Sequence, residues 1–145
     1  APTGNAFKLA LFSSNSASLG KGTTVYTAPA SANAVPTNTL EVSQSQTDGG
    51  ASNSGYTAGG AALTASADPV LSGDTACIKF NDVSFTSATF TARGCLLYNS
   101  TAVTGFTTNR SVFSINFGAD KTVTSGTFTV QFPAQTAGNA IVQIA

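Results

Sequence analysis

The stretch from Phe85 to Ser100 constrains the fold more than any other part of the chain. Apolar and small polar residues alternate from Phe85 to Ala92, and a continuous apolar run, Cys95–Tyr98, follows. Alternation with a period of two is typical of a strand with one buried face, and a continuous apolar run indicates cover on both faces. Gly94 is costly in a regular strand, so it predicts a bulge or a close backbone approach. We therefore expect a central strand here, with the other strands arranged on either side of it.

Shorter stretches elsewhere in the chain have the same alternating or apolar character. They lie at Phe7–Phe12, Thr23–Thr27, Ala61–Ala67, Ala76–Phe80, Val112–Phe117, Thr127–Phe132 and Ala140–Ile144. Leu40–Val42 is short and fits either a strand or a single helical turn. Turns rich in Gly, Pro, Ser and Asn separate these stretches. The pattern predicts an all-β fold with about eight strands, a single antiparallel, jelly-roll-like β-sandwich. Residues 1–145 would form this one domain.

Two of the predicted strands have the clearest amphipathic pattern. In the stretches 112–117 and 127–132 every second residue is apolar, and a turn at 118–121 separates them. Because the two alternations are in phase, we predict that their apolar residues share one buried layer. The predicted layer consists of Phe113, Ile115, Phe117, Phe128, Val130 and Phe132.

Two segments are too polar or too rich in glycine to belong to the core. Residues 1–6 form a candidate N-terminal arm, and residues 44–60 form a long Gly/Ser-rich loop with one aromatic residue. That aromatic residue, Tyr56, fits either an anchor for the loop or a contact at an interface. The candidate interface residues are Asn5 in the arm, Tyr56, the basic Arg93 beside Gly94, and Phe106 at the tip of a second polar loop.

The charge of the chain is balanced and low. Six basic and six acidic residues cancel, and charged residues make up 8% of the chain, against about 25% in an average domain. This predicts no basic surface for nucleic acid and no polybasic patch for a membrane. No apolar run reaches the ~18–20 residues of a membrane span. The first residues, Ala1–Gly4, do not resemble a signal peptide and fit removal of an initiator Met, although cleavage of a longer leader is an alternative.

The residue types needed for catalysis are scarce. The chain has no histidine, which excludes Ser-His-Asp triads and histidine metal sites. Its acidic residues fall mostly at predicted turns, where Asp caps the backbone; they are Glu41, Asp48, Asp68, Asp74, Asp82 and Asp120. Two turn aspartates and backbone carbonyls are an alternative that could form a Ca²⁺ site, but no D-x-D cluster supports it. We therefore expect no enzymatic activity, no cofactor and no metal site.

The two cysteines lie in different predicted strands. Cys77 and Cys95 could form a disulfide if their strands pair and their Cα atoms come within ~7 Å. The alternative is two buried free thiols that pack as small apolar side chains. We favour the free thiols, which a protein assembled in a reducing cytosol would retain.

Four segments stand out together in their order along the chain: Phe7–Phe12, Gly55–Leu63, Phe90–Asn99 and Phe117–Phe128. Taken in this order, they resemble a family of small tailed-bacteriophage virion proteins. The resemblance implies a virion structural protein, with the role of a capsid decoration (cement) protein on the head surface, assembled in the cytoplasm of the bacterial host. Its expected partners are the major capsid protein and further copies of this chain, as a dimer or trimer, with no nucleic acid and no membrane. The two cysteines are not part of the family pattern.

Other protein classes share part of this description. A phage tail or receptor-binding component would have a similar sequence character. A chaperone-usher pilin has about this length and two cysteines, but it carries a near-terminal aromatic residue, whereas this chain ends Ile141–Ala145. A carbohydrate-binding module normally needs exposed aromatic side chains, and this chain has no tryptophan. These classes stay open as alternatives to a decoration protein.

Overall fold

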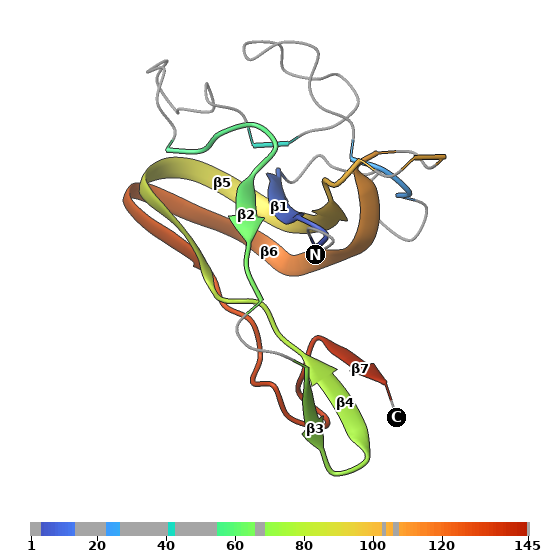
Figure 1. Ribbon diagram of the computed structural model, residues 1–145. Coiled ribbons are helices and arrows are strands. Elements are labelled where there is room, and N and C mark those ends of the chain that lie inside the picture. Colours follow the sequence, from blue (N-terminus) through green and yellow to red (C-terminus); the bar gives the residue numbers. More distant parts are fainter. Residues whose placement is uncertain are drawn as a thin grey trace. The chain divides into compact units, whose positions relative to one another are not determined.

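The computed structural model describes residues 4–13, 23–26, 41–42, 55–65, 69–102, 104–105 and 108–144, and these residues form an all-β structure (Figure 1). The strands are β1 (Phe7–Phe12), β2 (Ala61–Leu63), β3 (Val70–Ser72), β4 (Thr75–Ile78), β5 (Val83–Asn99), β6 (Arg110–Val130) and β7 (Val142–Ile144). This part of the chain contains no helix, and hence none long and apolar enough to cross a membrane. The predicted all-β class is confirmed.

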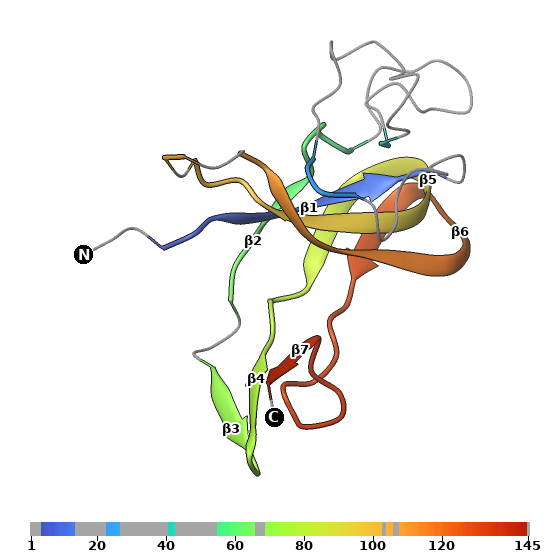
Figure 2. The ribbon, with the colours of Figure 1, turned by 90° about the vertical axis from the view of Figure 1, so that its right-hand side faces the viewer.

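The strands form two antiparallel sheets. The order is β2-β1-β5-β6 in the four-stranded sheet and β3-β4-β7 in the three-stranded sheet. Strand β1 pairs with the second half of β5, with Phe7 opposite Asn99 and Phe12 opposite Gly94 (Figure 2). The expected central strand is therefore present as β5, and it has a neighbour on each side.

The strand boundaries differ from the sequence prediction in three places. The stretch 112–117 and the first part of the stretch 127–132 belong to one long strand, β6, which ends at Val130. The predicted turn between them is a local deviation within this strand. There the Gly118 N–H donates to the Asn116 side chain at 2.8 Å, and Gly118 has a φ of 78°. Val25 and Glu41 form only isolated bridges, to Arg110 and Phe12. Strand β3 had not been predicted, because its three residues are too few to show a period.

The chain divides into two compact units. One consists of Ala1–Ala62 and Phe85–Phe128, and the other of Leu63–Ser84 and Thr129–Ala145. We call them the large unit and the small unit. Strands β5 and β6 contribute residues to both. Within the described residues seven strands are present, and the single sandwich domain stays a prediction.

The core of the large unit lies on both faces of the β1–β5 pair. Residues Leu9 to Leu11 are 0% exposed, and Leu96 and Leu97 are 1% and 0% exposed. On one face, β1 and β5 pack with Tyr26 in a cluster of Ala10, Phe12, Tyr26, Leu96 and Tyr98. Burial on both faces explains why the sequence of β5 changes from alternating to continuously apolar at Cys95.

The predicted six-residue buried layer is wrong. Alternation along β6 is present, but Phe113, Ile115, Phe117 and Phe128 are only half-buried. Val130 and Phe132 are buried, at 8% and 6% exposure, yet they belong to the small unit. The reason is position: β6 is at the edge of the four-stranded sheet, and a period of two fixes which face a residue is on, not how completely that face is covered.

Phe90 on β5 is the aromatic residue at the centre of the large unit. It is 3% exposed, and its ring centroid lies 5.1 Å from Phe128, 6.0 Å from Tyr56 and 6.1 Å from Phe85. We expect Phe90→Ala to lower the free energy of unfolding by about 3–5 kcal/mol, measured by chemical denaturation. The half-buried Phe117 is the matched control, and Phe117→Ala should cost clearly less. Equal losses in the two variants would show that Phe90 is not the centre of this packing.

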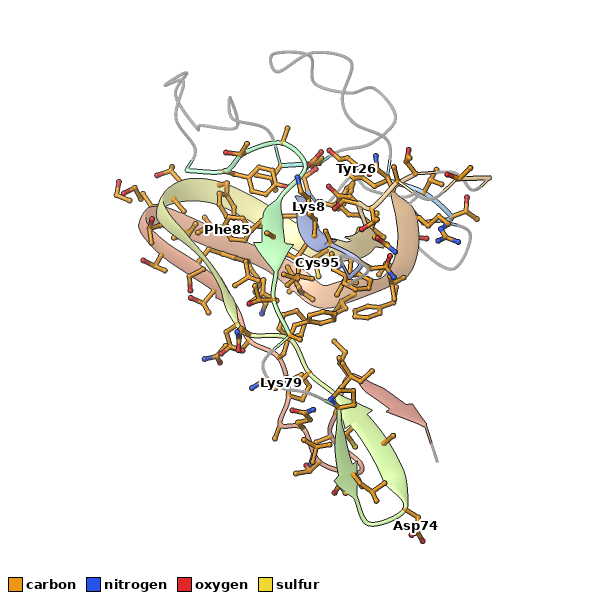
Figure 3. All side chains as sticks on the ribbon, viewed as in Figure 1. Lys8, Tyr26, Asp74, Lys79, Phe85 and Cys95 are labelled. Atoms are coloured by element: carbon orange, nitrogen blue, oxygen red, sulfur yellow. The ribbon has the colours of Figure 1, made fainter. Side chains whose placement is uncertain are left out.

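The small unit is held by hydrogen bonds around its own turns. Asp82 Oδ1 accepts from the Phe132 N–H at 2.9 Å, and Asn81 donates from its side chain to Thr64 at 3.0 Å. Asp74 is exposed in the turn between β3 and β4 (Figure 3). Asp74 thus lies at a turn as predicted, but Asp82 accepts from a residue 50 positions away and Asp120 lies within β6, so neither caps a turn. Asp48 and Asp68 lie outside the described residues.

Candidate functional site

The structure places the predicted interface residues in different environments. Asn5 is exposed, whereas Tyr56 is 2% exposed. Arg93 forms an ion pair with Asp120 at 3.3 Å, with 40% of its side chain exposed. Phe106 lies outside the described residues. Because Tyr56 is buried, the described residues of this set do not form one surface patch. Of the two roles expected for Tyr56, burial fits the anchor and not the interface contact.

The described end of the N-terminal arm is attached to the chain after β5. The Ala6 N–H donates to Thr101 Oγ1 at 2.6 Å, and the Ser100 N–H donates to the Ala6 carbonyl at 2.8 Å. Any free arm therefore ends before Ala6. Of the predicted arm 1–6, residues 1–3 lie outside the described residues.

The most unusual chemistry in the described structure surrounds Glu41. This residue, the single glutamate of the chain, is only 3% exposed. Its Oε2 accepts a hydrogen bond from the Tyr26 hydroxyl at 2.8 Å. Its Oε1 accepts from the Tyr56 hydroxyl at 2.6 Å and from the Gly59 N–H at 2.7 Å. Three donors thus converge on one buried carboxylate.

The third tyrosine completes this group. The Tyr98 hydroxyl donates to the Gly59 carbonyl at 2.8 Å, and its ring stacks on that of Tyr26 with centroids 4.4 Å apart. The Tyr56 oxygen also accepts from the Leu11 N–H at 3.0 Å. We call Tyr26, Glu41, Tyr56, Gly59 and Tyr98 the Glu41 cluster. It uses all 3 tyrosines of the chain and connects β1, β5 and the segment before β2.

The turn at Gly59 and Gly60 brings the cluster against β1. Both glycines have positive φ, 90° and 72°, a conformation that other residues adopt only with strain. A Cβ at Gly60 would overlap the Leu9 carbonyl oxygen, and would lie 2.7 Å from the Ala10 Cα. Only glycine allows the chain to pass this close to β1, so this pair fixes where the Gly59 N–H meets Glu41.

Burial raises the pKa of every titratable side chain in the Glu41 cluster. It raises the pKa of the Glu41 carboxyl, and the hydrogen bonds from Tyr56, Tyr26 and Gly59 only partly oppose it. Burial, followed by the negative charge of Glu41, raises the pKa of Tyr98 to about 12. The same two causes raise the pKa of Tyr26 and of Tyr56 well above the ordinary tyrosine value. These tyrosines stay protonated donors at neutral pH, and their chemistry suits holding a carboxylate better than nucleophilic attack.

The remaining reactive groups are buried as well. Cys77 and Cys95 are both free thiols and both 0% exposed. Burial raises the pKa of the Cys95 thiol to about 12, which disfavours the reactive thiolate; Figure 3 shows Cys95 within the large unit. Across the described ranges, no group of three His, Cys, Asp or Glu side chains could hold a metal ion.

Sequence reasoning found one member of the Glu41 cluster and missed the others. Tyr56 was singled out, but Glu41 was grouped with the turn acids, and neither Tyr26 nor Tyr98 was considered for a role. The available clue was compositional: a lone glutamate between two apolar residues, Leu40 and Val42, in a chain with few charges. A charge in an apolar stretch predicts a buried partner.

Comparison of the chain with family models, with curated proteins and with solved structures finds no match in any of the three.

Proposed function

We propose that the protein is a structural component of a tailed-bacteriophage virion, a decoration protein that binds the head shell and raises its resistance to rupture. The observation that carries the proposal is the order of the four sequence segments that resemble such virion proteins. Three of them, Phe7–Phe12, Gly55–Leu63 and Phe90–Asn99, contain β1, β2 and most of β5, which are neighbours in one sheet.

The chemistry of the described residues supports a role without catalysis. The buried Glu41 carboxylate accepts hydrogen bonds from the hydroxyl groups of Tyr26 and Tyr56, and both thiols are buried. The chain is neutral overall, which suits protein–protein contact because few charges lose their hydration at an interface. The proposal includes the jelly-roll-like sandwich expected from the sequence, assembly as a dimer or trimer, and the major capsid protein as partner.

A decoration protein stabilises a shell by mass action. It binds the assembled lattice and not the free subunits, so each bound copy shifts the equilibrium toward the intact shell. Individual contacts of standard interface size or smaller are sufficient, because many copies act on one particle. The protein would therefore be found on heads in high copy number and would not need a tight single site.

The test is a binding and rupture assay on the heads of the phage that encodes this chain. We expect added protein to co-sediment with heads that lack it and to raise the temperature at which they release DNA. Deletion of residues 1–5 should weaken binding while leaving the isolated fold intact, because it retains the Ala6 bonds to Ser100 and Thr101. Asp74→Asn, at the turn between β3 and β4, is the control and should bind normally.

One result would contradict the proposal, and another would contradict only the role given to the N-terminal arm. If the protein fails to bind heads and is located only at the tail tip, it is a tail or receptor-binding component. If the truncated protein decorates heads as well as the full chain does, the N-terminal arm is not the contact, and the expectation about residues 1–5 is wrong.

A further inference from the structure

The Glu41 cluster holds a negative charge that is removed from water. Glu41 is 3% exposed. Its carboxylate accepts hydrogen bonds from two tyrosine hydroxyl groups, those of Tyr26 and Tyr56, and from the Gly59 N–H. These donors favour the ionised form, and the ion pair found among the described residues lies elsewhere in the chain. A charge without a cation is unfavourable in such a site, so a reaction that removes this charge is favoured there.

The two oxygens of the carboxylate differ in what they can still accept. Oε1 already accepts from both Tyr56 and Gly59. Oε2 accepts from the Tyr26 hydroxyl at 2.8 Å, and from no other group among the described residues. Because two donors draw electron density from Oε1, Oε2 is the better proton acceptor. The proton that can pass most easily to Glu41 is therefore the one on the Tyr26 hydroxyl.

The Tyr26 ring is also placed to lose an electron. It stacks on the Tyr98 ring with centroids 4.4 Å apart and an interplanar angle of 9°, and two overlapping phenol rings can share a positive charge. The Tyr56 ring contacts phenyl rings instead. The Tyr98 hydroxyl donates to the Gly59 carbonyl, which is too weak a base to take its proton. Tyr26 is the most exposed of the three tyrosines, at 7%, so an oxidant in solution reaches it most easily.

We propose that the Glu41 cluster is a redox site, in which Tyr26 gives one electron to a soluble one-electron oxidant, such as an oxygen-derived radical, and gives its hydroxyl proton to Oε2 of Glu41. The O–H bond of Tyr26 breaks, an O–H bond forms on Glu41, and the oxidant is reduced by one electron. A neutral tyrosine and a carboxylate thus become a neutral tyrosyl radical and a neutral acid, which removes the buried charge. This inference does not depend on the proposed virion role.

The first test identifies the residue that is oxidised. Light, a ruthenium tris-bipyridine complex and a cobalt(III) electron acceptor generate the one-electron oxidant, and electron paramagnetic resonance after rapid freezing detects the tyrosyl radical. We expect a tyrosyl signal from the folded wild type. Tyr26→Phe keeps the stacked ring without the hydroxyl group and should lose most of that signal. Tyr98→Phe is the matched control: it removes a hydroxyl group that has no carboxylate partner, and it should retain the signal.

The second test asks whether the proton passes to Glu41. If electron and proton leave Tyr26 together, the wild type should reduce the ruthenium(III) complex more slowly in D₂O, after exchange of its hydroxyl groups, than in H₂O. Glu41→Gln keeps the shape of the side chain but offers an amide oxygen, which is too weak a base, so this variant should lose most of the radical signal. Asp120→Asn removes a carboxylate that is 46% exposed and should retain the signal.

Each outcome decides the inference. A signal that disappears in Tyr56→Phe and persists in Tyr26→Phe would overturn it, as would equal reduction rates in H₂O and D₂O. An undiminished signal in folded Glu41→Gln would show that the proton does not go to this carboxylate, and the proposal would be wrong. If Glu41→Gln does not fold, the comparison of the two solvents decides, because it requires no variant.

Discussion

Gly60→Ala is expected to unfold the large unit or to lower its free energy of unfolding by more than about 4 kcal/mol. The added methyl group would overlap the Leu9 carbonyl oxygen and approach the Ala10 Cα, both of which are backbone atoms of β1. Leu9 and Ala10 are fully buried and pair with Leu97 and Leu96 of β5. Neither strand can therefore move away without disrupting the core. The loss should appear as a large fall in the denaturation midpoint.

Gly118→Ala separates this steric effect from backbone strain. Gly118 has a φ of 78°, close to the 72° of Gly60, but a methyl group there would meet no atom within 4 Å. The control should therefore cost only the left-handed strain, about 1–2 kcal/mol. If the two alanine variants unfold at the same denaturant concentration, the close approach of Gly60 to β1 does not contribute to stability.

Local pattern was sufficient to predict the central part of the large unit. The six residues of β1 and the change from alternating to continuous apolar character in β5 indicated those strands correctly. Gly94 was predicted to mark a bulge or a close approach, and a Cβ there would lie 2.6 Å from the Ile115 carbonyl oxygen. That prediction of a close approach is confirmed. Each of these features leaves a local mark in the sequence, either a period or a glycine where a strand disfavours it, even though the partner of Gly94 lies in β6.

Contacts between distant residues that leave no local pattern in the sequence were not predicted. Glu41 lies 15 residues from both Tyr26 and Tyr56, and Tyr98 reaches Gly59 across 39 residues. No periodicity links such positions, and the hydrogen bonds form only once the strands have assembled. The degree of burial along β6 likewise depends on the position of β6 at the edge of the sheet. The sequence of β6 alone does not reveal that position.

The free energy of unfolding is expected to fall unusually steeply with pH in alkaline solution, because of the three tyrosines. Burial raises the pKa of each of them, for Tyr98 to about 12, whereas a tyrosine in the unfolded chain ionises near pH 10. Above that pH the folded state retains protons that the unfolded state releases, so stability falls as the pH rises. Each retained proton contributes a slope of about 1.4 kcal/mol per pH unit, and three contribute about 4 kcal/mol per pH unit.

The measurement combines denaturation at a series of pH values with tyrosine absorbance. Cys95, whose pKa is raised to about 12, adds to the slope from a lower pH, since a free thiol ionises near 8.5. The Tyr98→Phe variant isolates the tyrosine part. It should lower the slope above pH 10 by about 1.4 kcal/mol per pH unit, because one proton fewer is retained. In the wild type, tyrosinate absorbance should appear together with unfolding and not before it. Tyrosinate formation near pH 10 in a protein that is still folded would mean that the hydroxyl groups are open to solvent, and the Glu41 cluster would then not be closed.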